Sequence, residues 1–169
     1  MPRPAPNDSA PFYHKYIELV AESEPLEAFQ AQDDWLADWL NSFSEDQADY
    51  AYAPGKWSIK QVFQHMIDTE RIFAHRALWF ARCSTEPQPG FDENAYAQVA
   101  TVAHRSLASL KDELLAVRRS TLCLMESFTT NEFSRSGTAS GHFVTVNALA
   151  FMLLGHVLHH KSVLEERYG

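Results

Sequence analysis

The sequence predicts an all-α protein, a four-helix bundle preceded by a short helical segment at the N-terminus. Apolar residues recur at three- and four-residue steps along four long stretches, which is the spacing of one face of a helix. Clusters of proline, glycine and serine separate these stretches, and no segment reads as a strand. A chain of 169 residues is long enough for one core. We therefore expect a single bundle domain over residues 12–169.

The N-terminal residues divide into a tail and two helical segments. Residues 1–11 are rich in proline, and we expect a disordered or extended tail there. Residues 12–20 predict a short helix with an apolar edge that lies against the body. Residues 26–43 predict the first long helix, because its apolar positions share one stripe: Leu26, Phe29, Leu36, Leu40 and Phe43. Asp33 also falls on that stripe, and we interpret it as one turn that drifts off the core.

The remaining helices are predicted from their first residues. Ser58 is a good N-cap with Gln61 completing a capping box, so a second helix is expected over residues 59–83, before prolines at 87 and 89. One helical turn is expected near residues 92–99. Ser106 caps a third helix that reaches about residue 128 with a seven-residue apolar rhythm. After a loop over residues 134–143, Thr145 caps a fourth helix that reaches about Tyr168.

Charge and composition exclude several classes of function. The chain has 14 basic and 22 acidic residues, a net charge of −8, which argues against a nucleic-acid partner. We interpret Arg118 and Arg119 as an ordinary solvated helix face. The longest apolar run, residues 146–158, is too short to span a bilayer. No apolar stretch follows Arg3, so we expect no secretory signal and a soluble, cytoplasmic protein.

The two cysteines, Cys83 and Cys123, lie far apart and outside any CxxC spacing. Two reduced, buried thiols are the simpler interpretation in a cytoplasmic protein. One disulfide is the alternative.

Three of the eight histidines have the spacing of metal ligands. His156 and His160 are four residues apart on the apolar face of the fourth helix, so both rings point into the bundle. His65 lies on the apolar face of the second helix. Two imidazoles at this spacing occur in the His-Glu-x-x-His zinc motif, although Val157 replaces the catalytic glutamate here. We therefore expect one divalent metal ion bound by His65, His156 and His160.

Two further residues are candidates around that ion. His159 could replace His160 as the second ligand of the fourth helix, and Asp68 could orient the ring of His65 through its second N–H. The competing interpretation is a set of core or solvated histidines without metal. Three imidazoles suit zinc, nickel, copper or iron alike. The remaining histidines have no partner at ligand spacing: His14, His75, His104 and His142.

Arg76 shares the face of His65 but lies about 16 Å along the helix axis, too far to act on the metal. Pairing with Asp92 or Glu93 is the structural interpretation, which we favour. Anchoring an acidic substrate is the functional alternative.

The chain resembles the DinB-like family of metal-dependent enzymes over residues 12–168. The resemblance is carried by the Lys-Trp-Ser-Ile opening and the terminal histidine cluster, with further similarity at residues 53–65, 68–76, 89–94, 137–142 and 155–160. It implies a four-helix bundle, often dimeric. It also implies a histidine triad at His65, His156 and His160 that binds a divalent ion, commonly nickel or zinc. Some relatives are transferases or isomerases that use low-molecular-weight thiols such as bacillithiol or mycothiol.

These observations together predict a thiol-dependent S-transferase reaction on a small electrophilic substrate. Three nitrogen ligands leave open positions on a metal for water or substrate, as in catalytic sites. A metal-dependent hydrolase would use the same triad with activated water. A non-catalytic, metal-binding or stress-related bundle is the third hypothesis.

The fourth helix carries a second apolar stripe, opposite the histidines, at Phe151, Leu154 and Leu158. A helix that is apolar all round must be covered on both sides. Either the N-terminal segment or a symmetric partner covers it, and the second arrangement predicts a homodimer.

Overall fold

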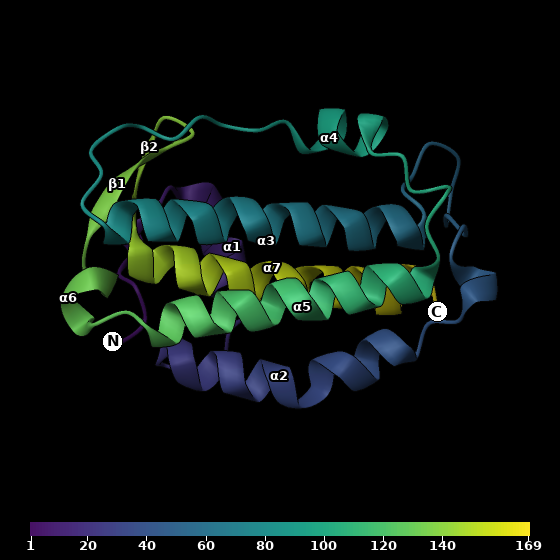
Figure 1. The fold of residues 1–169 in the computed structure, drawn as a ribbon, viewed down its shortest axis with the longest axis horizontal. Coiled ribbons are helices and arrows are strands. Elements are labelled where there is room, and N and C mark those ends of the chain that lie inside the picture. Colours follow the sequence, from purple (N-terminus) through teal and green to yellow (C-terminus); the bar gives the residue numbers. More distant parts are fainter.

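Four long helices lie side by side and confirm the predicted fold class (Figure 1). The computed structural model describes residues 1–169. The bundle consists of α2 (Pro25–Asn41), α3 (Ile59–Ala81), α5 (Leu107–Glu126) and α7 (Val146–Arg167). Helix α3 lies between α5 and α7, and α2 closes the bundle against the same two helices.

The order of the helices along the chain differs from a simple up-and-down bundle. Helices α3 and α5 run in the same direction, opposite to α2 and α7 (Figure 1). The connection between α3 and α5 must therefore return along the whole bundle, and it carries the short helix α4 (Glu93–Val99) over the side of α3. This crossover places α4 over the N-terminal half of α3 (Figure 1).

The helices begin where their caps predict. The Ser58 hydroxyl accepts a hydrogen bond from the backbone N–H of Gln61, whose side chain accepts one from the Ser58 N–H at 2.8 Å. Ser106 and Thr145 cap α5 and α7 through their hydroxyls. Each cap satisfies a backbone donor that the helix itself leaves without a partner.

A β-hairpin occupies part of the segment that was predicted to be a loop. Strands β1 (Ser136–Ala139) and β2 (His142–Thr145) pair antiparallel after the short helix α6 (Thr130–Phe133). Ser140 and Gly141 form the turn with φ values of 53° and 79°. Positive φ at both central residues is typical of a tight hairpin turn. The prediction was wrong because four-residue strands are too short to show an alternating pattern.

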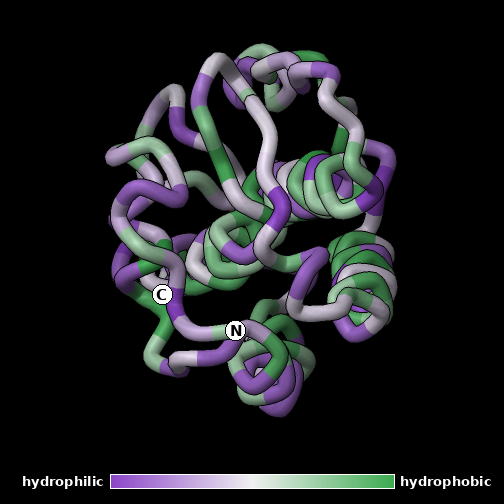
Figure 2. Tube along the Cα trace, turned by 90° about the vertical axis from the view of Figure 1, so that its left-hand side faces the viewer, coloured by the Kyte–Doolittle hydropathy of each residue, from purple (hydrophilic) through white to green (hydrophobic).

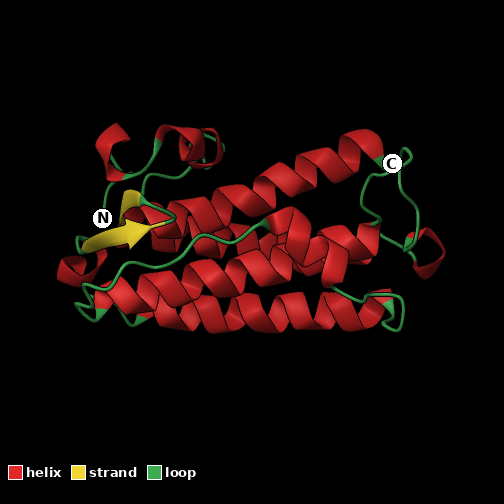
Figure 3. Ribbon diagram, turned by 90° about the horizontal axis from the view of Figure 1, so that it is seen from above, coloured by secondary structure: helices red, strands yellow, loops and turns green.

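The N-terminal residues pack along α7 and cover its second apolar stripe. They form 3-10 turns at Pro6–Asp8 and Pro11–Tyr13 and the one-turn helix α1 (His14–Ile17), which lie beside the bundle (Figure 3). A methyl group at Gly155 would lie 2.0 Å from the Tyr16 carbonyl oxygen, so the two backbones are in close contact. Arg3 of this segment lies 5.6 Å from the ring centroid of Phe151. Phe151 and Leu154 are buried within the single chain, whereas Leu158 is partly exposed, and the homodimer remains a prediction.

Residues 1–11, expected to be disordered or extended, are held against the bundle by polar contacts. Arg3 donates to the Ile17 carbonyl at 2.9 Å, and Asn147 of α7 donates to the Pro2 carbonyl at 2.8 Å. The tail therefore follows a defined path beside α7.

Apolar residues gather on the inner sides of the helices (Figure 2). They form two clusters, one around Phe80 and Phe151 and one around Phe63 and Leu110. Asp33 is exposed, as interpreted from the sequence. No helix combines the length and the apolar character needed to cross a membrane.

Two predictions about polar residues were wrong. Arg118 is not on a solvated face: it is 1% exposed and forms an ion pair with Glu70 at 2.8 Å. Arg118 lies on the buried face of α5, one turn from both Leu114 and Leu122. Cys83 and Cys123 are free as predicted, but both are exposed: Cys83 follows the end of α3, and Cys123 lies in the last turn of α5.

Candidate metal centre

Three buried histidines from two antiparallel helices meet inside the bundle. His65 comes from α3, and His156 and His160 come from α7, with exposed fractions of 6%, 7% and 9%. The Nε2 atom of His156 lies 3.0 Å from Nε2 of His65 and 3.1 Å from Nε2 of His160. One ligand atom from each ring lies within 4.8 Å of the others.

The sequence places the rings there through local packing. His156 and His160 are one helical turn apart on the inner face of α7, and α3 is packed against this face. The Trp57 ring, just before α3, lies 4.9 Å from the His65 ring between centroids. Tyr16 of α1 lies 5.9 Å from the His156 ring. Aromatic side chains thus flank the histidines on two sides.

Burial keeps the three rings neutral at neutral pH. Desolvation is the largest cause that lowers the pKa of His65, from 6.5 to about 4, with a smaller contribution from the charge of His159. The pKa values of His156 and His160 are also well below 6.5, first because of burial and then because of charge on neighbouring histidines. A neutral imidazole offers a lone pair, which is the form that binds a metal.

The arrangement of donors fits a divalent metal ion. Tetrahedral coordination with nitrogen ligands at about 2.0–2.1 Å separates neighbouring nitrogens by about 3.3 Å. The separations of 3.0 and 3.1 Å are close to this value. The hydrogen-bond partners of His156 Nε2 are the Nε2 atoms of the other two rings. When Nδ1 carries the proton of each ring, the lone pairs of all three Nε2 atoms converge. A cation satisfies such a convergence of lone pairs.

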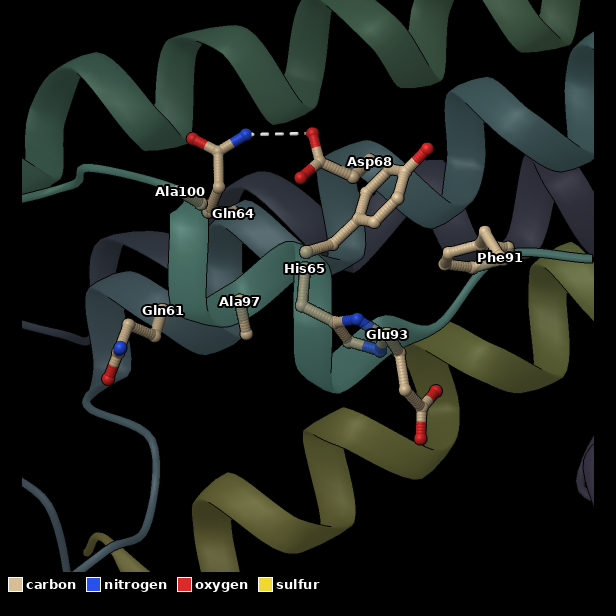
Figure 4. A pocket seen from close by; sticks show the side chains of 9 residues that line it. Gln61, Gln64, His65, Asp68, Phe91, Glu93, Ala97 and Ala100 are labelled. Atoms are coloured by element: carbon tan, nitrogen blue, oxygen red, sulfur yellow. Dashed lines mark hydrogen bonds between the residues drawn. The ribbon is translucent and has the colours of Figure 1, made fainter.

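Each histidine also borders a different cavity. His156 lines the largest of the three, a cleft of about 300 Å³ that is bordered by α1, α3, α4 and the hairpin. His160 lines a cleft of about 220 Å³ together with Trp57 and Tyr168. His65 faces a small cavity of about 10 Å³ beneath α4 (Figure 4). A bound ion would therefore be accessible from outside the bundle, unlike an ion in a closed structural site.

Comparison with protein families matches residues 28–164 to the DinB superfamily. The chain belongs to the DinB superfamily. No curated protein matches this sequence. The predicted resemblance is confirmed over most of the chain.

Solved structures show the same fold as this DinB-superfamily chain. YfiT from Bacillus subtilis is described as a probable metal-dependent hydrolase with an unusual four-helix bundle topology. It is 20% identical with a TM-score of 0.70, and the match covers 96% of this chain and 89% of YfiT. The DinB-like protein YjoA from Bacillus subtilis is 19% identical with a TM-score of 0.60, covering 85% and 88% of the two chains.

A mycothiol-dependent maleylpyruvate isomerase also matches, at 12% identity and a TM-score of 0.64. The match covers 89% of this chain but 59% of the isomerase, so the isomerase is considerably longer. At these identities the likeness concerns the fold.

The structure places the two predicted neighbours of the triad differently. The Asp68 carboxylate accepts a hydrogen bond from Gln64 at 2.9 Å and makes none with the His65 ring (Figure 4). His159 lies outside the group of three, with its ring 5.1 Å from His160 and 5.3 Å from Tyr16. The orienting role predicted for Asp68 thus has no supporting contact, because its side chain leans along the surface of α3.

Arg76 does not pair with Asp92 or Glu93, so the favoured structural interpretation was wrong. It is buried and donates to the Pro89 carbonyl at 2.6 Å and to the Ser140 hydroxyl at 3.2 Å. Glu93, which sequence reasoning did not place at the site, lines the cavity at His65 (Figure 4) and also the cleft at His156. No pattern in the sequence indicates that Glu93 lies at the site, because its position depends on how the crossover lies over α3.

Proposed function

We propose that His65, His156 and His160 bind one divalent metal ion, zinc or nickel, and that the protein is an enzyme acting on a small molecule. The observation that carries this proposal is the convergence of three neutral Nε2 atoms next to an open cleft. Membership of the DinB superfamily and the description of YfiT as a probable metal-dependent hydrolase support it.

The reaction we propose is thiol-dependent S-transfer to a small electrophile. A divalent ion bound to the triad would supply Lewis acidity and lower the pKa of a thiol bound there. The solved structure of an isomerase described as mycothiol-dependent shares this fold and supports a low-molecular-weight thiol as cosubstrate. The cleft at His156, about 300 Å³ in volume, has room for a small substrate.

The chain's own residues supply the rest of the chemistry. The thiol sulfur forms a bond to an electrophilic carbon, and the leaving group departs with its bonding electrons. The thiol proton passes to the carboxylate of Glu93, which lines both the His65 cavity and the His156 cleft. The aromatic rings of Phe12, Phe73 and Phe91 line the cleft and give it apolar walls.

Elemental analysis tests the metal site. Protein purified without a histidine tag should contain about one divalent ion per chain, and a His65→Ala, His156→Ala double variant should contain none. A double variant of the exposed histidines His104 and His142 is the matched control and should keep the ion. Equal metal content in the triad variant and the wild type would disprove the assignment.

Conjugation assays test the reaction. Metal-loaded protein should accelerate the addition of thiols to model electrophiles, and chelator-treated protein should not. Glu93→Gln should lower kcat by about 10²-fold or more, as expected for a residue that accepts a proton. Identical rates with and without metal would reject thiol transfer.

A metal-dependent hydrolase is the second candidate, favoured by the similarity to YfiT over 89% of that protein. Hydrolysis of ester or amide substrates in the absence of thiol would identify it. A bundle that binds metal but turns over neither class of substrate would be the non-catalytic alternative.

A further inference from the structure

A buried arginine without a carboxylate partner lies beside the cleft that begins at His156. Arg76 is 2% exposed and takes part in no ion pair. The other interior arginine, Arg118, is neutralised by Glu70 at 2.8 Å. A buried charge without a counter-charge is unfavourable. Arg76 therefore marks a position where an anion would be stabilised.

The neighbours of Arg76 form one end of this cleft. Its guanidinium carbon lies 5.5 Å from the ring centroid of Phe73 and 5.9 Å from that of Phe91. Its Nη2 donates to the Ser140 hydroxyl, and the Tyr13 hydroxyl lies beside both groups. All four of these neighbours line the cleft, whose other wall includes His156. The same cavity thus connects the histidine triad with the surroundings of Arg76.

The hydroxyl of Ser140 is prepared to bind an anion. It accepts a hydrogen bond from Arg76 and lies next to the Tyr13 hydroxyl, so a hydrogen bond between the two hydroxyls uses one O–H and leaves the other to donate into the cleft. A hydroxyl that already accepts from a cation is a stronger donor, because the two hydrogen bonds polarise each other. The hairpin turn, with φ of 53° at Ser140, fixes the position of this side chain. Lys15 adds an ammonium group to the same cleft.

We propose that Ser140 and Tyr13, backed by the charge of Arg76, bind the carboxylate of a small organic acid whose other end reaches the histidine triad. Thr69, which lines the cleft one turn after His65, is seven residues from Arg76 on α3, or about 10 Å along the axis. The carboxylate and the reacting group of the ligand are thus separated by several bonds. The apolar rings of Phe73 and Phe91 accept the part between them. The placement of the ligand's reacting group at the histidine triad rests on the proposed function, whereas the carboxylate-binding subsite does not.

Arg76 also borders a second cleft, of about 290 Å³, on the outer side of Phe91 together with Arg71 and His75. Arg71 is paired with Glu113 at 2.6 Å, and this cleft does not reach the triad. The inner cleft is favoured because it holds the polarised hydroxyl of Ser140 and an unpaired lysine. Binding of the anion in the outer cleft is one of the outcomes that the test distinguishes.

Direct binding tests the subsite without any reaction. The probes are 4-phenylbutyrate and its uncharged amide, titrated calorimetrically into metal-free and metal-loaded protein. We expect the acid to bind at least about tenfold more tightly than the amide in both forms, since charge-assisted hydrogen bonds are the stronger ones. Tyr13→Phe and Ser140→Ala should reduce this preference severalfold. Tyr16→Phe, which removes a hydroxyl from the same cleft beside His156, should leave it unchanged.

Several results would overturn the proposal. Equal affinity for acid and amide in the wild type, or no measurable binding of the acid at millimolar concentration, would do so. A preference that survives Tyr13→Phe and Ser140→Ala but disappears in His75→Ala would move the anion to the outer cleft. Both cleft variants remove single atoms from partly exposed side chains, and their unfolding by urea should match the wild type.

Turnover assays show whether the thiol or the electrophile carries the carboxylate bound at this subsite. They also separate this proposal from the proposed function. One pair of reactants is glutathione and its dimethyl ester; the other is 4-(chloromethyl)benzoate and its methyl ester. The pair whose KM differs about tenfold, with kcat unchanged, identifies the reactant bound at Ser140. Preference for the acid in metal-free protein that catalyses no thiol transfer would leave the subsite intact. Thiol transfer without any preference for the acid would leave only the function intact.

Discussion

Lowering the pH should destabilise the metal-free protein through its buried histidines. Burial lowers the pKa of His65 from 6.5 to about 4. Between these two values the unfolded chain binds a proton that the folded protein does not. The free energy of unfolding therefore falls as the pH decreases through this window, and it recovers as the pH rises towards 6.5.

The magnitude follows from the shift. Each pH unit in the window is worth about 1.4 kcal/mol for one group, so His65 alone should cost about 2 kcal/mol between pH 6.5 and 5. His156 and His160 have pKa values lowered in the same direction and add to the loss. Glu70 has a pKa raised by burial and acts in the opposite direction, because its protonation favours the folded state.

Urea unfolding of wild type and His65→Asn at pH 6.5 and pH 5, with a chelator present, isolates the contribution of His65. Asparagine does not titrate, and the carboxylates are common to both proteins. The wild type should lose about 2 kcal/mol more than the variant over this interval. Parallel losses in the two proteins would show that His65 titrates normally when folded, and would refute the buried, neutral ring.

Three further predictions concern the metal, the N-terminal segment and the core. Zinc or nickel at about 100 times its dissociation constant should add about 2.7 kcal/mol to the free energy of unfolding, and His65→Ala should abolish the gain. Gly155→Ala should cost at least about 3 kcal/mol in urea unfolding, because the new methyl group meets the Tyr16 backbone. Glu70→Gln should cost about 3–5 kcal/mol by leaving Arg118 buried without a counter-charge, and a Glu70→Met, Arg118→Met double variant should recover most of that loss.

Matched controls accompany these measurements. Gly90→Ala adds the same methyl group where the nearest atom is 3.5 Å away, so it should change stability by less than about 1 kcal/mol. A Gly155→Ala protein as stable as Gly90→Ala would contradict the close contact with α1. A double variant at Glu70 and Arg118 no more stable than Glu70→Gln would contradict the view that the unpaired charge of Arg118 causes the loss.

Local signals allowed the helices to be predicted. The caps at Ser58, Ser106 and Thr145 depend on residues three positions away, so they can be read from the sequence alone. The exposure of Asp33 could also be predicted locally, since a small rotation of the helix accommodates one polar residue on an apolar stripe. The hairpin depends instead on pairing between two four-residue strands, which carry too little pattern to reveal it.

Charged residues in the interior were the main failure of sequence reasoning. Arg118 and Glu70 are 48 positions apart, and neither has a local feature that marks it as buried. Their pairing depends on the parallel packing of α3 and α5, which is set by the crossover. Arg76 was placed on the correct helix face, but its partner Ser140 lies in the hairpin, 64 positions away.

The histidines were easier to predict because spacing fixes half of the site. His156 and His160 share a face at any helix packing, and the face of His65 follows from its apolar neighbours. The sequence does not give the position of α3 relative to α7 along their axes, and it is this position that brings the Nε2 atoms together. The contact of Asp68 could not be derived in this way, because whether a carboxylate reaches a ring or leans towards Gln64 depends on side-chain rotamers rather than on spacing.

Part of the cleft at His156 is lined by residues outside the segment that matches the superfamily. The match covers residues 28–164, whereas Tyr13, Lys15 and Tyr16 belong to the N-terminal segment and line the cleft at His156. Gly155, directly before His156, permits this segment to contact α7 through backbone atoms. The three histidines can thus stay in place while another N-terminal sequence presents different groups to the ligand. Variation in that segment should therefore change KM among related chains more than it changes affinity for the metal.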